Sequence, residues 1–347
     1  MGGVAPYHIN REETVMKKII GLSCGRKNGN CETLLKEAAM GAEEFGVETE
    51  IIRAMALKVL PCNGCNGCFQ TGKCVLKDDV EWILEKTCVE DCALIVAVPC
   101  YHVRANGYFA CINERMNHVF MKNMDILKKT RVGAMIGVGG SGYDGWTSLN
   151  NPMVNIFMQH TRVLVDMIQV NYCALKEWNI WAREDLTPVT HKVRVTDIDY
   201  DDMYKVWPGQ YDRVDFFKKS LERARELGRN VAKAMMIPIE EVKYVGEKSG
   251  VSCPVCHSNV LVVHEDLPYV ACPICWVRGV VSSEGGKMKV QWNEADAKKP
   301  RFSYDGDKHH MEWLGRHYFM NPQYFKAVDE LTEKHREYGK IIKPEKS

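Results

Sequence analysis

Eight of the fifteen cysteines in this 347-residue chain fall into two tight groups of four. Clustered cysteines in a chain of this length are typical of metal sites, because disulfide frameworks belong mainly to small secreted domains. The first group has the spacing C-x2-C-x2-C-x5-C, and the second consists of two C-x2-C pairs fifteen residues apart. Each group offers four thiolates, and the two spacings predict different metal chemistry.

The first group lies in the segment PCNGCNGCFQTGKC. Three cysteines at consecutive two-residue gaps can wrap one face of a cubane cluster while a fourth closes the far corner. The glycines between them permit the tight turns that this requires, and zinc more often uses two separated knuckles. We therefore predict a 4Fe–4S cluster, with zinc, free thiols or a disulfide as alternatives. The candidate ligands are Cys62, Cys65, Cys68 and Cys74.

The second group has the spacing of a zinc ribbon, in which two knuckles are joined by a short β excursion. A rubredoxin-like iron site uses the same ligands, but the intervening loop is short for rubredoxin. We therefore predict zinc, with iron as the alternative. A unit of this size has a small core, so a structural metal is the expected role, and only iron would allow electron relay. The candidate ligands are Cys253, Cys256, Cys272 and Cys275.

A third feature is the segment GLSCGRKNGNCETLLKEA, where an apolar strand runs into a helix. Helix N-termini present unpaired N–H groups and the positive end of a dipole, which favour a phosphate. The segment is neither a Walker A motif nor G-x-G-x-x-G, so a dinucleotide site is disfavoured. The alternative is an ordinary capped turn. The candidate phosphate contacts are Ser23, Arg26, Asn28, Asn30 and Thr33.

This loop followed by PCNGCNGCFQTGKC resembles the iron–sulfur flavoprotein family, part of the NAD(P)H-dependent FMN reductase and flavodoxin-like group. The resemblance covers about residues 16–236. It implies that the loop holds the phosphate of FMN and that the compact cysteine motif holds a 4Fe–4S cluster. It also implies flavin sites at subunit contacts, and hence a homodimer or homotetramer.

Two further flavin segments of that family have counterparts here. Its Ser-Pro-x-Tyr segment corresponds to Val98-Pro99-Cys100-Tyr101-His102, and its glycine-rich loop to Gly139-Gly140-Ser141-Gly142. The first segment lacks the family's serine, and Cys31 stands where a hydroxyl residue is usual in the phosphate loop. Cys100 and His102 are unusual neighbours for a flavin ring. They are the candidate catalytic residues, and simple packing against the ring is the alternative. The predicted ring contacts are Pro99, Cys100, Tyr101, His102, Gly139, Gly140 and Ser141.

Five apolar segments alternate with helical stretches, as in a parallel sheet covered on both faces. The predicted fold class is α/β, a flavodoxin-like doubly wound five-stranded parallel sheet plus a small four-cysteine β-rich metal module. The predicted strands are Lys17–Leu22, Val47–Arg53, Ala93–Val98, Val132–Val138 and Val163–Val170. The predicted helices are Glu32–Phe45, Asp78–Lys86, Tyr108–Leu127, Asn150–His160 and Tyr211–Met236.

The expected domains are an N-terminal extension (1–15), a flavodoxin-like FMN and iron–sulfur domain (16–240), a zinc-ribbon or rubredoxin-like module (251–292) and a C-terminal tail with one helix (293–347). Residues 186–210 interrupt the strand–helix alternation and are expected to form an excursion from the core.

The amino-acid composition argues against some classes of function. The 46 basic residues balance 45 acidic ones, which argues against a nucleic-acid or membrane-surface partner. No signal peptide or spanning segment is evident, so a cytoplasmic protein is expected. The leading hypothesis is a redox protein that passes electrons from a ferredoxin-like donor through a 4Fe–4S cluster and FMN to a small-molecule acceptor. The alternatives are an NAD(P)H-dependent FMN or quinone reductase, and a non-enzymatic zinc-ribbon adaptor.

Overall fold

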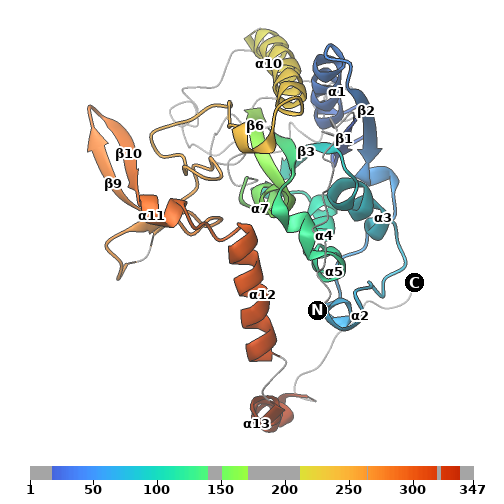
Figure 1. Ribbon diagram of the computed structural model, residues 1–347, viewed down its shortest axis with the longest axis vertical. Coiled ribbons are helices and arrows are strands. Elements are labelled where there is room, and N and C mark those ends of the chain that lie inside the picture. Colours follow the sequence, from blue (N-terminus) through green and yellow to red (C-terminus); the bar gives the residue numbers. More distant parts are fainter. Residues whose placement is uncertain (1–17, 140–150, 171–211, 264, 319–321, 337–347) are drawn as a thin grey trace, which may run out of the picture. The chain divides into compact units, whose positions relative to one another are not determined.

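The computed structural model describes residues 18–139, 151–170, 212–263, 265–318 and 322–336 (Figure 1). The chain divides into two compact units, residues 1–303 and 304–347. The extension at 1–15, the segment 186–210, Gly140 and Ser141 lie outside the described residues. The flavodoxin-like part and the four-cysteine module both belong to the first unit, and a domain boundary between them stays a prediction.

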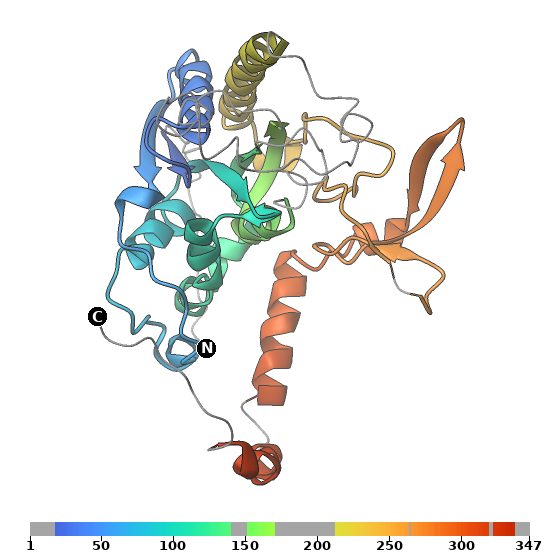
Figure 2. The ribbon, with the colours of Figure 1, turned by 180° about the vertical axis from the view of Figure 1, so that it is seen from behind.

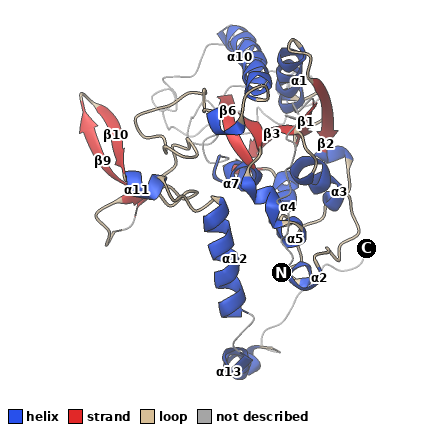
Figure 3. Ribbon diagram, in the orientation of Figure 1, coloured by secondary structure: helices blue, strands red, loops and turns tan. Residues whose placement is uncertain are grey.

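A parallel sheet in the order β2-β1-β3-β5-β6 forms the centre of the first unit (Figure 3). This is the doubly wound order typical of flavodoxin-like folds, so the predicted five-stranded sheet is confirmed. A short strand, β4, adds antiparallel to β3. The strands are β1 (Lys18–Ser23), β2 (Glu48–Arg53), β3 (Ala93–Tyr101), β4 (Arg104–Ala105), β5 (Arg131–Val138) and β6 (Arg162–Val170).

Both faces of the sheet are covered by helices, which explains why its strands are almost continuously apolar. In β3, Leu94 and Val96 belong to one core layer, whereas Ile95 belongs to the other. The layer that contains Ile95 is formed with α1 (Asn30–Glu43) and α10 (Asp212–Ala234), which lie side by side in Figures 1 and 2. The opposite layer is formed with α3 (Val80–Leu84), α4 (Gly107–Glu114), α5 (Asn117–Lys122) and α7 (Asn151–Thr161).

Glycine allows α1 and α10 to touch through their backbones. A Cβ atom on Gly228 would lie 1.8 Å from the carbonyl oxygen of Ala38, and one on Gly41 would lie 2.0 Å from that of Arg225. Any side chain at either glycine would therefore push the two helices apart. Because α1 begins at the candidate phosphate loop, this close packing helps to fix the position of that loop.

The predicted helix 108–127 is divided into α4, α5 and the 3-10 helix η3 (Met124–Lys128). The break lies at Arg115, whose buried guanidinium turns toward Asp78 instead of continuing a regular helical surface. Such a tertiary ion pair cannot be read from local periodicity. Other short turns of helix are α2 (Gly67–Thr71), η1 (Ala54–Ala56), the π-helical η2 (Glu85–Val89) and η5 (Ile239–Glu241).

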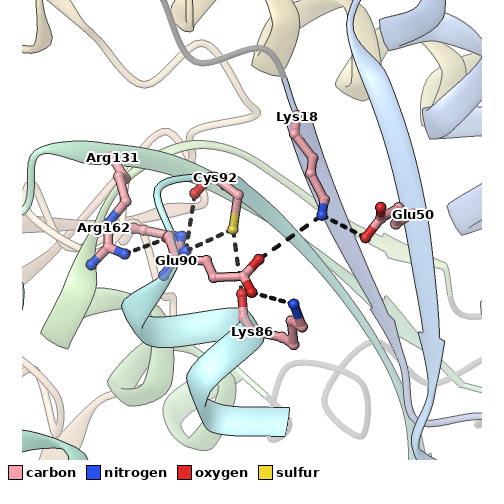
Figure 4. Close-up of polar contacts among 7 residues, drawn as sticks. All are labelled: Lys18, Glu50, Lys86, Glu90, Cys92, Arg131 and Arg162. Atoms are coloured by element: carbon pink, nitrogen blue, oxygen red, sulfur yellow. Dashed lines mark hydrogen bonds and ion pairs between the residues drawn. The ribbon is translucent and has the colours of Figure 1, made fainter. Parts of the chain in front are cut away.

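Buried arginines close the amino edge of the sheet, where Figure 4 shows them beside Cys92. Arg162 donates to the carbonyl oxygen of Cys92 at 3.1 Å, and Arg131 donates to the carbonyl oxygens of Val89 and Glu90 at 3.1 and 2.7 Å. Burial, together with the neighbouring charge of Arg162, lowers the pKa of Arg131 to about 10. These contacts hold the turn that enters β3.

The four-cysteine module contains a small antiparallel sheet, which confirms the predicted β-rich module. Its sheet has the order β10-β9-β8-β7, and its core includes the four cysteines, Ile274 and Val277. The backbone N–H of Val245 donates to the carbonyl oxygen of Val165 at 2.8 Å and so joins the connecting segment to β6. The elements are β7 (Val262–Val263), β8 (Val270–Ala271), β9 (Arg278–Glu284), β10 (Lys287–Trp292) and α11 (Glu294–Ala297).

In the described residues, the tail at 293–347 contains three α-helices, α11 and two in the second unit, so the prediction of one helix there was wrong. The predicted helix corresponds to α13 (Pro322–Thr332), followed by the 3-10 helix η6 (Glu333–His335), and α12 (Tyr304–Tyr318) is additional. Asp305 and Asp307 lie in the first turn of α12. Acidic residues at that position favour a helix through its dipole, even though the segment looks merely polar. Among the described residues, no helix is long and apolar enough to cross a membrane.

Candidate functional site

The register of the sheet brings three predicted cofactor segments to one edge. Ser23 at the end of β1 pairs with Ala97 of β3, and Pro99 of β3 pairs with Val138 of β5. The N–H of Gly139 then donates to the carbonyl oxygen of Val170 at 2.8 Å. The loop after β1, the end of β3 and the first glycine after β5 therefore lie on adjacent strands at the carboxyl edge, where open α/β sheets bind ligands.

The loop after β1 has the features of an anion site. Helix α1 begins at Asn30 behind Gly29, an N-cap residue that offers no side chain to its N–H groups. Thr33 Oγ1 donates to the carbonyl oxygen of Gly29 at 2.9 Å, so its hydrogen is used within the helix. Ser23 Oγ is buried and has no hydrogen-bond partner among the described residues. Ser23 ends β1 and begins the loop that leads into α1, and a buried hydroxyl in such a loop fits a phosphate oxygen.

A buried carboxylate that sequence reasoning missed holds this loop in shape. Glu32 accepts the N–H of Asn28 at 3.0 Å and two hydrogen bonds from Arg53 at 3.0 and 2.8 Å, and it pairs with Lys36 at 2.6 Å. The Arg53 contact, assisted by Lys36 and the Asn28 N–H, holds the pKa of Glu32 at about 2. Asn28 has a φ of 58°, a left-handed conformation that asparagine tolerates. The only signal in the sequence is a glutamate three residues after the N-cap, the position of a capping box.

Asn106 joins the same loop to the end of β3 and was also missed. Its side chain donates to the carbonyl oxygen of Cys24 at 2.6 Å and accepts the N–H of Phe109 at 3.2 Å, which caps α4. Its backbone N–H donates to the carbonyl oxygen of Pro99 at 3.2 Å. One buried amide thus fixes two cofactor segments relative to each other. An asparagine directly before a helical stretch is an N-cap signal, but its long-range contact is not visible in the sequence.

The end of β3 forms a tight hairpin with β4. His102 and Val103 occupy its two central positions with φ of 48° and 69°, values that two-residue hairpins require. Tyr101 and Val103 are both exposed. Burial raises the pKa of the half-buried Cys100 thiol, so the neutral thiol is favoured over a reactive thiolate. Both candidate catalytic residues therefore lie beside the edge, and contact with a flavin stays a prediction.

The first cysteine quartet lies on a loop at the surface. Cys62 and Cys65 are exposed, whereas Cys68 and Cys74 are half-buried. Asn66 and Gly72 flank the short helix α2 in left-handed conformations, so the loop turns sharply, as a cluster-binding run requires. Within the described residues, the four sulfurs of this quartet are not gathered as those of the second quartet are. The donor set fits an iron–sulfur cluster, and the cluster stays a prediction.

The second quartet is a preformed metal site. Its four sulfur atoms lie within 4.8 Å of one another and all four residues are buried; within the described residues, no other group of cysteines is gathered in this way. Each C-x2-C pair forms a knuckle: the N–H of His257 donates to the carbonyl oxygen of Cys253, and that of Trp276 to Cys272, both at 3.0 Å. The positive φ of His257 and Trp276 produces these turns. Four buried thiolates suit a four-coordinate metal ion, and both zinc and iron fit this set of ligands.

Comparison with known proteins adds sequence relatives. Residues 17–172 match a family model described as NADPH-dependent FMN reductase. An iron–sulfur flavoprotein of Methanocaldococcus jannaschii is 32% identical over 149 residues, which are 43% of this chain and 75% of that protein. An iron–sulfur flavoprotein of Methanosarcina thermophila is 34% identical over 129 residues, which are 37% of this chain and 66% of that protein. The family model lies within the flavodoxin-like part.

One solved structure resembles nearly the whole chain. A flavone reductase matches with a TM-score of 0.65 and 21% identity, and the match covers 94% of this chain and 100% of that one. At this level of identity the likeness shows the fold alone. It extends the structural agreement beyond the flavodoxin-like part to the four-cysteine module.

Proposed function

This chain belongs to the iron–sulfur flavoprotein family, and from that premise we propose that it is an oxidoreductase that uses FMN and a 4Fe–4S cluster. Its electrons come from a ferredoxin-like donor and go to a small-molecule acceptor. When bound, FMN supplies a centre that exchanges electrons singly or in pairs, and it can therefore join a one-electron cluster to a two-electron acceptor.

The observation that carries this proposal is the carboxyl edge of the sheet. Ser23 offers a buried hydroxyl without a described partner, and α1 begins beside it with an N-cap that has no side chain. We assign the FMN phosphate to this loop, where the N–H groups of α1 and the side chains of Ser23, Arg26 and Asn28 would hold it. The absence of a dinucleotide motif favours FMN over FAD.

The other residues at the edge position the cofactor. Asn106 keeps the loop after β1 at a fixed distance from Pro99, and Glu32 keeps the backbone of Asn28 in its left-handed turn. Tyr101 ends β3 and His102 follows it, so their side chains would lie beside the flavin ring. The first quartet would hold the cluster, which supplies one-electron transfer.

The proposal is tested by replacing Arg26 and Asn28 together with alanine. Loss of these donors should weaken FMN retention at least tenfold, measured as the dissociation constant of FMN by fluorescence titration. Lys27→Ala is the matched control, because Lys27 is an exposed cation of the same loop. Recovery of FAD from the purified protein, or an unchanged FMN affinity in the double variant, would contradict the assignment.

A second candidate is an NAD(P)H-dependent FMN or quinone reductase, which the family model over residues 17–172 favours. Hydride transfer from a nicotinamide stacked on the flavin needs no separate fingerprint. Anaerobic mixing separates the two candidates: rapid bleaching of the flavin by NADPH supports the second, and bleaching only by a reduced ferredoxin supports the first.

We also propose a homodimer or homotetramer, because the family implies flavin sites at subunit contacts. Light scattering of the FMN-loaded protein at micromolar concentration tests this, and a monomer would refute it.

A further inference from the structure

A charged side chain from outside the cysteine loop reaches one of the four predicted cluster ligands. Arg115 Nη2 donates to the sulfur of Cys74 at 3.2 Å, although the two residues are 41 positions apart. Among the four described cysteines of the first quartet, Cys74 is the only one whose sulfur receives a hydrogen bond from a charged side chain. A guanidinium donor to a ligating sulfur is one of the features that set the potential of iron–sulfur clusters.

Arg115 is held rigidly in this position. Its side chain is 1% exposed, and its Nη1 atom pairs with the carboxylate of Asp78, which is fully buried. Asp78 also accepts the N–H of Leu60 at 2.8 Å, while Asp79 accepts the N–H of Lys58 at 2.8 Å. Both aspartates follow the cysteine loop in the sequence, and both bind residues that precede it. They therefore hold the two ends of the loop together. The guanidinium is therefore fixed between the base of the loop and Cys74.

The other described charges near this loop are less favourably placed to act on the cluster. Lys122 pairs with Glu81 at 3.3 Å and both side chains are more than 40% exposed, so water screens them. Lys73 lies beside Cys74 in the sequence, but it is exposed, so water screens its charge. Arg115 and Asp78 are the charges that lie in the interior, where the dielectric constant is lower and each charge acts more strongly.

We propose that Arg115 raises the reduction potential of the cluster by donating to Cys74, and that Asp78 opposes this effect while it positions Arg115. The inference rests on the proposed function, because it requires a cluster on the first quartet. In the step concerned, a ferredoxin-like donor loses one electron and the cluster gains it, and no bond is broken. The cluster becomes more negative by one unit of charge. A cation at its ligand stabilises that reduced state, and a carboxylate destabilises it.

Two variants test the inference because their predicted effects have opposite signs. Arg115→Gln keeps a hydrogen-bond donor but removes the charge, and it should lower the equilibrium constant of cluster reduction at least tenfold, which is about 59 mV for one electron. Asp78→Asn keeps an acceptor for the N–H of Leu60 and should raise that constant. The readout is an anaerobic redox titration followed by electron paramagnetic resonance. Arg115→Lys should lie between wild type and Arg115→Gln. Arg229→Gln, at an exposed arginine–glutamate pair with Glu44, is the matched control.

The outcomes are separable. If both variants shift the potential in the same direction, Arg115 and Asp78 only stabilise the loop, and the inference is overturned. An unchanged potential in both variants at full iron content overturns it as well. If Arg115→Gln fails to retain iron, the potential of Asp78→Asn is the deciding measurement. A potential in Asp78→Asn that is lower than or equal to that of wild type refutes the inference. Wild-type protein without iron would overturn the inference and the proposed cluster together, whereas a loaded cluster with no effect of either variant leaves the proposed function intact.

Discussion

Replacing Glu32 with glutamine should destabilise the protein by an amount that depends on pH. The carboxylate lies beneath the proposed phosphate loop and is fully buried. Arg53, Lys36 and the N–H of Asn28 all favour its ionised form, and they lower its pKa from 4.5 to about 2. Glutamine has nearly the same shape and can still accept the N–H of Asn28, so the substitution removes the charge and little else.

The size of the effect follows from this pKa. Each unit corresponds to about 1.4 kcal/mol, so the depression amounts to roughly 3 kcal/mol of folding free energy. The side chains of Arg53 and Lys36 are 41% and 43% exposed, and water screens part of their interaction with Glu32. We therefore expect Glu32→Gln to lower the free energy of unfolding by about 2 kcal/mol at neutral pH.

The sign of the pH dependence is also determined. A carboxylate whose pKa is lower in the folded state stabilises that state fully above its unfolded pKa and loses this effect as the pH falls toward its folded pKa. The difference between wild type and Glu32→Gln should therefore be constant above about pH 5.5, fall to roughly half near pH 3.5 and vanish near pH 2. Urea unfolding at several pH values measures it.

Glu48→Gln serves as the control, because Glu48 is an exposed carboxylate on β2. It should have little effect at any pH. The reasoning would be refuted if Glu32→Gln were as stable as wild type at pH 7, or if its deficit stayed the same down to pH 3. FMN retention provides a second readout, since the turn at Asn28 loses its anionic anchor.

Four other substitutions have defined outcomes. Cys74→Ala should remove or convert the cluster on the first quartet and leave the metal of the second quartet in place, as iron and zinc analysis would show. Cys111→Ala is the control. Loss of both metals would mean that the predicted boundary between 16–240 and 251–292 is wrong. Val103→Asn should raise the free energy of unfolding by about 1 kcal/mol, because a β-branched residue is strained at a φ of 69°; an unchanged thermal midpoint would count against strain. His102→Ala and Cys100→Ser are measured at full FMN loading. If the two side chains take part directly, each variant should change turnover at least tenfold, or about 1.4 kcal/mol. Wild-type turnover in both variants would mean that the two side chains only pack against their neighbours.

Periodicity and cysteine spacing predicted the main architecture. The five strands follow from apolar runs such as Ala93–Val98, since only strands buried on both faces are so uniformly apolar. The second quartet followed from its two knuckles, which are local structures. One strand end was placed too early: β3 continues through Pro99 to Tyr101, because Cys100 and Tyr101 pair with β4 beyond the position where proline lacks an N–H.

Long-range polar contacts could not be predicted in this way. The pair Glu32–Arg53 joins residues 21 positions apart, and Asn106 contacts Cys24 across 82 positions. Each residue type has an ordinary local interpretation, as a capping glutamate or an N-cap asparagine. Their roles at the cofactor edge depend on which strands become neighbours. The sequence therefore predicted the segments that meet at the carboxyl edge of the sheet, but not the contacts that stabilise them.

The central claim is that one chain holds both FMN and an iron–sulfur cluster, and anaerobic purification followed by cofactor analysis tests it most directly. The measurement combines the visible spectrum with flavin extraction and with iron, sulfide and zinc content. The account predicts about one FMN and about four iron per chain on the first quartet, besides one ion on the second. A colourless protein that contains zinc but neither flavin nor sulfide would contradict it.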